Sequence, residues 1–233
     1  MVESSIEIKT KQAVNNNIAL CECIAVANGI QPGFIDGVWM SSRPMPPYYP
    51  NLITTQPNLN ISHHIEHLKE VLALEWGIKD SFSEHDLLAS GFRVAVSGCW
   101  FSMCGNANTR YFPSEGSSVI TVRSGTDFKR WISAWDSPMD GKIFPHDIWC
   151  SKDLEFVFVE RENQLMGGFL LNRTSNNVGV SNWFGKFDLV NWALRKVISP
   201  SQCVVGYADD RELNELTSFG FERLQAMKVW ICN

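Results

Sequence analysis

The order of strand-like and helix-like segments between residues 117 and 233 constrains this fold most. Short segments that read as strands are interleaved with amphipathic helices. The predicted elements are a strand at 119–123, a helix from Asp127, strands at 154–160, 165–172 and 178–180, a helix at 187–198, a strand at 203–207, a helix at 211–218 and a strand at 221–231. This order predicts an α/β domain with a mixed sheet and helices on both faces.

The first 115 residues predict a second α/β unit with a different order of helices and strands. A helix is expected over 11–28, and the proline-rich stretch 44–50 cannot be helical and reads as an extended connector. A strand at 51–55, helices at 62–74 and 84–89, and a strand at 92–101 follow. Because 104–116 is polar and rich in turn residues, we place a boundary there and predict lobes at 1–115 and 116–233.

The two halves contain a similar short pattern. Residues 86–92 read as a helix end, a Gly-Phe turn and a strand with Trp100 eight residues later. Residues 215–221 repeat this pattern, with Trp230 nine residues after Phe221. Chance similarity of two helix-Gly-strand units is the alternative, but we favour a duplicated unit whose first copy has lost its cofactor turn.

Composition excludes several classes of protein. The hydrophobic share of 45% and the nine Trp residues are typical of a globular chain. The 20 basic residues are outnumbered by 25 acidic ones and form no run that could bind the backbone of a nucleic acid. The N-terminus lacks the basic-then-apolar order of a signal peptide, and no apolar stretch reaches the roughly 18 residues of a membrane span. We therefore expect a cytoplasmic protein, whose seven scattered cysteines are interpreted as small buried thiols.

Two segments of the C-terminal half resemble the GCN5-related N-acetyltransferase (GNAT) superfamily. The segment 213–224, with Gly220-Phe221, is similar to the family's last helix and its turn into the final strand. The segment 178–187 is similar to the strand-to-helix junction whose backbone N–H groups hold the pyrophosphate of coenzyme A. The resemblance implies a GNAT-like, mainly antiparallel sheet that binds acetyl-CoA, through residues Val178, Gly179, Val180, Ser181, Asn182, Gly185 and Lys186.

The resemblance also implies positions for proton transfer, and there the sequence departs from the family. Many members carry a Tyr four residues before the Gly of the terminal turn, where this chain has Leu216. Because leucine cannot move a proton, Tyr207 is the substitute general acid, and Glu160 is the candidate general base among the carboxylates near the middle strands. The bulky Phe187 stands where the family has a small residue.

The resulting hypothesis is an acetyl-CoA-dependent N-acyltransferase acting on a small-molecule or peptide amine. The alternative is a non-catalytic GNAT-like binding or regulatory module, which Leu216 and Phe187 favour. An unrelated α+β fold is a third reading, because fold analogy alone does not establish function. His63 and His67 lie one helical turn apart, but they lack the HExxH order and a third ligand, so we predict a polar helix start and no metal.

Overall fold

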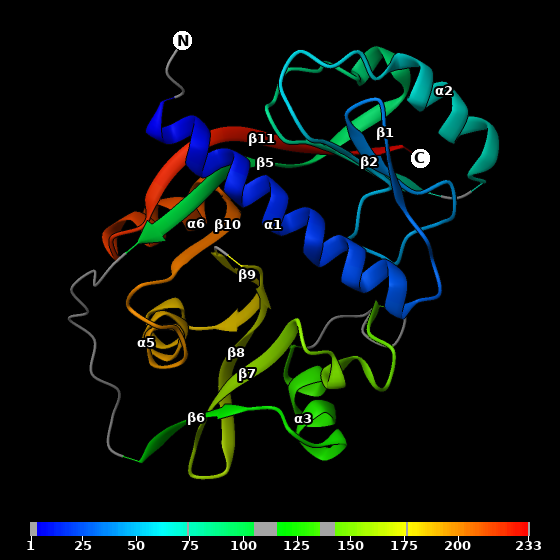
Figure 1. Cartoon of the computed structure of the whole chain (residues 1–233). Helices are drawn as coiled ribbons and strands as arrows, with labels where there is room; N and C mark the ends of the chain where they lie inside the picture. Colours follow the sequence, from blue (N-terminus) through cyan, green and yellow to red (C-terminus); the bar gives the residue numbers. More distant parts are fainter. Residues whose placement is uncertain (1–3, 74, 105–115, 136–142, 176, 233) are drawn as a thin grey trace.

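The computed structural model describes residues 4–73, 75–104, 116–135, 143–175 and 177–232 (Figure 1). Its described helices include none that is long and apolar enough to cross a membrane. The α-helices are α1 (Ser5–Ala27), α2 (Ser62–Val71), α3 (Gly125–Trp135), α5 (Phe187–Val197) and α6 (Asp210–Ser218), with short 3₁₀ turns at Leu88–Ser90 and Ile148–Cys150.

All the described strands join one sheet. They are β1 (Gly33–Ile35), β2 (Val38–Met40), β3 (Leu52–Thr54), β4 (Trp76–Asp80), β5 (Phe92–Cys104), β6 (Ser117–Thr121), β7 (Leu154–Arg161), β8 (Gln164–Arg173), β9 (Asn177–Gly185), β10 (Cys203–Asp209) and β11 (Glu222–Cys232). The order in space is β1-β2-β3-β4-β11-β5-β10-β9-β8-β7-β6. Among the described strands only β3–β4 and β9–β10 pair in parallel, which confirms the prediction of a mixed and mainly antiparallel sheet.

The two central strands are exchanged between the halves of the chain. Strand β5, from the first half, lies between β11 and β10 of the second. Strand β11, the last of the chain, lies in turn between β4 and β5 of the first half. The sheet is therefore continuous across the boundary drawn at 115/116, and residues 105–115 of that boundary lie outside the described part.

Pairing of β5 with β11 obeys an approximate two-fold symmetry. Arg93 pairs with Ile231 and Glu222 with Ser102, and an offset of 129 residues converts one pair into the other. The turns that precede the two strands match as well, since Phe92 N donates to Leu87 O and Phe221 N donates to Leu216 O, both at 3.2 Å. The similar pattern seen in the sequence thus corresponds to a structural repeat.

Helices cover both faces of the sheet, as predicted. Helices α5 and α6 pack on Phe101 and Val204, and α2 packs on the same face farther along, against Trp230. The neighbouring residues Trp100 and Val205 point to the opposite face, because side chains alternate along a strand. That face is covered by α1 and α3, and in Figure 1 α1 (blue) runs across the junction of the two halves.

Local expectations were partly wrong. The helix expected over 84–89 is only the 3₁₀ turn Leu88–Ser90, because the Asp86 side chain accepts a hydrogen bond from Leu88 N and competes with helix formation. Helix α2 begins without a side-chain cap from Ser62 and ends at Val71, and residue 74, its expected end, lies outside the described part. Cys104 and Cys203 form a disulfide between β5 and β10, which corrects the prediction of free thiols for these two residues.

Candidate functional site

Strands β9 and β10 separate from one another in the middle of the sheet. They pair in parallel only as far as Gly179 and Val205. Beyond that point β9 bulges against β8, and Asn182 takes a left-handed conformation with φ of 49°. The divergence opens a gap between two otherwise adjacent strands.

A cavity of about 250 Å³, which we call the central cavity, occupies this gap under helix α1. Helix α1 can approach closely because Gly179 has no side chain: a Cβ there would lie 2.0 Å from Asn16 Oδ1. The Asn172 side-chain amide also donates to Asn16 O and to Asn16 Oδ1, both at 2.9 Å, which fixes the helix on the sheet. The lining includes α1 residues Asn16, Asn17 and Cys21, strand residues Lys79, Gly179, Val180, Ser181, Asn182, Trp183, Gly206 and Tyr207, and Tyr48, Tyr49 and Glu212.

The central cavity contains a buried cation. Lys79, on β4, is 2% exposed, and its ammonium group donates to Asn17 Oδ1 at 2.7 Å. The same nitrogen lies 4.0 Å from the centre of the Tyr207 ring, which is a cation–π contact. An ammonium group held this way can bind an anionic group or a developing negative charge.

Burial favours the neutral form of two further groups of the cavity, the Tyr49 phenol and the Cys21 thiol. Burial raises the pKa of the Tyr49 phenol well above its usual value, and its hydroxyl donates to Asn182 Oδ1 at 3.5 Å. Burial also raises the pKa of Cys21 to about 11, so this thiol is not a nucleophile near neutral pH. Among the described residues, the buried Ser181 hydroxyl has no hydrogen-bond partner.

A second cavity of about 580 Å³, the outer cavity, lies between the starts of α5 and α6. Trp183 and Glu212 line both cavities and separate them, with Trp183 Nε1 donating to Glu212 Oε1 at 3.1 Å. Burial raises the pKa of Glu212 above its usual value. Gly185 and Lys186 line the outer cavity at the N-terminus of α5, which has no side-chain cap.

A third cavity of about 260 Å³, the proline cavity, lies under residues 45–51. Its lining is mainly apolar, with Trp76, Val96, Val229 and Ile231 among its residues. Tyr48, Tyr49 and Tyr207 line both this cavity and the central one. The outer, central and proline cavities therefore follow one another through the molecule.

The structure brings most of the residues singled out from the sequence together. Gly179, Val180, Ser181, Asn182 and Tyr207 line the central cavity, and Gly185 and Lys186 line the outer one. Val178 is fully buried and lines none of the three cavities.

The structure places Glu160 elsewhere. It lies on β7, its carboxylate forms an ion pair with Arg130, and it lines none of the three cavities. Sequence reasoning missed Lys79, Asn17 and Glu212. The one signal for Lys79 was a charged residue inside a short apolar strand.

The ring of Phe187 belongs to an aromatic cluster beside the outer cavity. Its centre lies 6.2 Å from that of Trp183 and 5.5 Å from that of Phe219. Phe101 and Phe221 extend the cluster under the sheet. This arrangement fills space next to the wall between the outer and central cavities.

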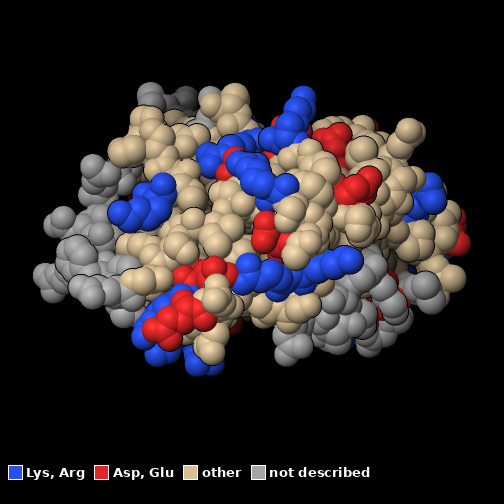
Figure 2. All heavy atoms as spheres, turned by 90° about the horizontal axis from the view of Figure 1, so that it is seen from below, with Lys and Arg blue, Asp and Glu red and all other residues tan. Residues whose placement is uncertain are grey.

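Charges of both signs are mixed on the face shown in Figure 2. Lys and Arg side chains alternate there with Asp and Glu, and they form no continuous basic track on this face.

Comparison with solved structures identifies the fold. A GCN5-related N-acetyltransferase from Kribbella flavida matches with a TM-score of 0.65 at 10% identity, over 93% of this chain and 95% of its own. A tandem GNAT protein from the clavulanic acid biosynthesis pathway matches with a TM-score of 0.54 at 11% identity, over 95% and 94%. The chain has a GNAT fold. A functionally unknown conserved protein from Staphylococcus epidermidis ATCC 12228 matches with a TM-score of 0.61 at 12% identity, over 87% and 94%.

These matches establish the GNAT fold and not the reaction, because one fold hosts many functions. No protein-family model and no curated protein matches the sequence. The likeness extends over nearly the whole chain, so the first half belongs to the GNAT-like architecture together with the second.

Proposed function

We propose that this protein is an acetyl-CoA-dependent N-acyltransferase, with acyl transfer in the central cavity. The observation that carries the proposal is the divergence of β9 and β10, which leaves a cavity lined by Gly179, Asn182 and Tyr207. The proposed location in the cell is the cytoplasm.

The outer cavity is the proposed site for the phosphates of the cofactor. The N-terminus of α5 offers backbone N–H groups and the positive end of the helix dipole, although Asp188 Oδ1 accepts from the Leu189 N–H there. Lys186 and Arg211 add positive charge at the same cavity, whose lining also includes the carboxylates of Asp188, Asp209, Glu212 and Glu215. The Ser181 hydroxyl, which has no hydrogen-bond partner among the described residues, would bind polar atoms of the part of the cofactor that extends from the outer cavity into the central one.

Residues of the central cavity have proposed roles in the chemistry. Bound acetyl-CoA would supply a thioester carbon, at which the amine forms a C–N bond as the C–S bond breaks. Tyr207 is the candidate donor of a proton to the leaving sulfur. Glu212 replaces Glu160 as the candidate base, because it lines this cavity and its raised pKa suits proton uptake from an ammonium group.

The acceptor would enter from the proline cavity, on the other side of Tyr49 and Tyr207. The apolar lining there suits an amine with an apolar body, and the Lys79 ammonium suits an anionic or carbonyl oxygen of that substrate. The acceptor class proposed is therefore a small-molecule or peptide amine with an apolar group.

A non-catalytic binding module is the second candidate. The hydrogen bond between Trp183 and Glu212 separates the outer from the central cavity, and the ring of Phe187 packs beside Trp183. A protein whose two cavities stay separated would bind the phosphate end of coenzyme A without delivering an acetyl group.

Calorimetric titration with acetyl-CoA and with coenzyme A tests the proposal. We expect binding that Lys186→Glu weakens at least tenfold and that Lys196→Glu, at the opposite end of α5, leaves unchanged. Absence of binding by the wild-type protein would refute both candidates. Binding without thiol release in the presence of a panel of apolar amines would favour the binding module.

A further inference from the structure

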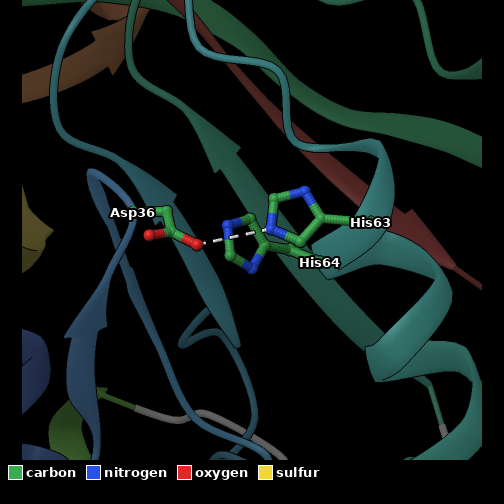
Figure 3. A group of neighbouring side chains, drawn as sticks. All are labelled: Asp36, His63 and His64. Atoms are coloured by element: carbon green, nitrogen blue, oxygen red, sulfur yellow. Dashed lines mark ion pairs between the residues drawn. The ribbon is translucent and has the colours of Figure 1, made fainter.

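Three potential metal ligands meet at the edge of the sheet, outside the cavities described above. Asp36 lies in the turn between β1 and β2, and His63 and His64 lie in the first turn of α2 (Figure 3). One ligand atom from each residue lies within 4.8 Å of the other two. None of the three lines the cavities described above.

The hairpin turn fixes the position of Asp36. Asp36 and Gly37 have φ of 47° and 80°, the left-handed pair that a two-residue hairpin turn requires. His63 Nε2 lies 3.6 Å from Asp36 Oδ2. The turn therefore presents a carboxylate to the start of α2.

His64 supplies a second, independent observation. It is 4% exposed, and among the described residues its Nε2 atom has no hydrogen-bond partner. A buried polar atom without a partner destabilises the folded state. Figure 3 shows the rings of His63 and His64 side by side, both turned toward the Asp36 carboxylate.

We infer that Asp36, His63 and His64 bind a zinc ion that fastens α2 to the β1–β2 hairpin. Two imidazoles and one carboxylate are a common zinc ligand set, with water completing four-fold coordination. Zinc bonds of about 2.0 to 2.2 Å require the three ligands to draw closer together. Asp36 and His63 can make this movement because their side chains are 73% and 62% exposed.

This ligand set differs from the pair that helical spacing suggested. Helical spacing alone suggests His63 and His67 as a pair of metal ligands, because one turn of helix separates them. In the structure His67 Nε2 instead lies 3.2 Å from Ser42 Oγ, and the residue is outside the three-ligand group. The carboxylate of the neighbouring hairpin takes its place.

The ion would serve stability and not acyl transfer. Strand β1 is the last strand on its side of the sheet and pairs only with β2 in the described sheet. Helix α2 also lacks a side-chain cap at its N-terminus. A metal bridge would connect these two elements and oppose fraying of the sheet edge.

Thermal unfolding of the full chain, without a histidine tag and treated with a chelator, tests the inference. Zinc at 100 times its dissociation constant should raise the unfolding temperature by about 5 to 10 °C. Calorimetry should give one ion per chain. No rise and no binding would overturn the inference.

Variants assign the ligands. Asp36→Asn and His63→Ala change exposed residues, so each should fold, bind zinc at least tenfold more weakly and lose the temperature rise. His67→Ala is the matched control on the same helix and should keep it. Loss of binding in His67→Ala with retention in Asp36→Asn would overturn the assignment.

Discussion

The ammonium group of Lys79 lies 4.0 Å from the centre of the Tyr207 ring, although the two residues come from opposite halves of the chain. Lys79 is on β4 of the first half, and Tyr207 is on β10 of the second. Strands β11 and β5 separate β4 from β10, and the two side chains meet across them in the central cavity under α1. The site is therefore composed of both halves of the molecule.

Lys79→Met should destabilise the fold through Asn17. The Asn17 side-chain oxygen would lose the Lys79 ammonium and keep the weak Cys21 thiol donor at 4.0 Å, at a cost of about 1 to 3 kcal/mol in the free energy of unfolding. Adding Asn17→Leu removes the poorly paired acceptor, so the double variant should recover part of this loss. Urea unfolding followed by tryptophan fluorescence measures both. A double variant less stable than Lys79→Met would contradict this account of the pair.

Tyr207→Phe should lower the rate of acyl transfer without lowering the stability of the fold. The phenyl ring keeps its contact with Lys79 and its edge-on contact with Trp100, so the unfolding temperature should stay within about 2 °C of the wild type. Loss of the hydroxyl should lower kcat by about 10²- to 10⁴-fold, if Tyr207 donates the proton. Thiol release measures the rate, and an unchanged kcat would exclude that role.

Glu212→Gln should change how stability depends on pH. Burial raises the folded-state pKa of Glu212 above its ordinary value of 4.5, so the folded protein binds this proton more tightly than the unfolded chain. The associated stability is present below the ordinary pKa and is lost as pH rises through the raised one. Glutamine does not titrate and can still accept from Trp183.

The measurement for Glu212 is the free energy of unfolding between about pH 4 and pH 7. The variant should gain stability relative to the wild type as the pH rises across this range. A difference between the two proteins that is constant with pH would contradict the buried state of the carboxyl group.

Gly98→Ala should disrupt the centre of the exchanged strands. A Cβ at this position would lie 2.0 Å from Ala208 O on β10. Overpacking of this kind costs about 1 to 3 kcal/mol. Gly33→Ala is the control, because a Cβ there meets nothing within 4 Å. Chemical unfolding of both variants gives the comparison, and equal stability of the two would contradict the tight contact between β5 and β10.

Local pattern predicted helix α5 and strand β7. Helix α5 places its apolar residues along one face at the helical period, and β7 is a short apolar run buried on both faces, so their existence could be predicted without knowing their partners. The turn at Gly220 could also be predicted from the local sequence, because a helix end in the left-handed conformation favours glycine.

Long-range pairing could not be predicted in the same way. The sequence of 92–104 does not show that this strand lies between β10 and β11, because the pairing depends on residues 99 or more positions away. The hydrogen bond between Asn17 and Lys79 likewise joins residues 62 positions apart. The site residues that were missed are those whose role arises from such pairings.

The exchange of β5 and β11 affects when the sheet can be completed during synthesis of the chain. While the ribosome holds residues 222–232, the gap between β4 and β5 has no strand to fill it, and both edges remain exposed. Neither half can then complete its sheet until residues 222–232 have left the ribosome. The sheet of this protein should therefore close late, when the eleven-residue strand β11 becomes free to pair with β4 and β5.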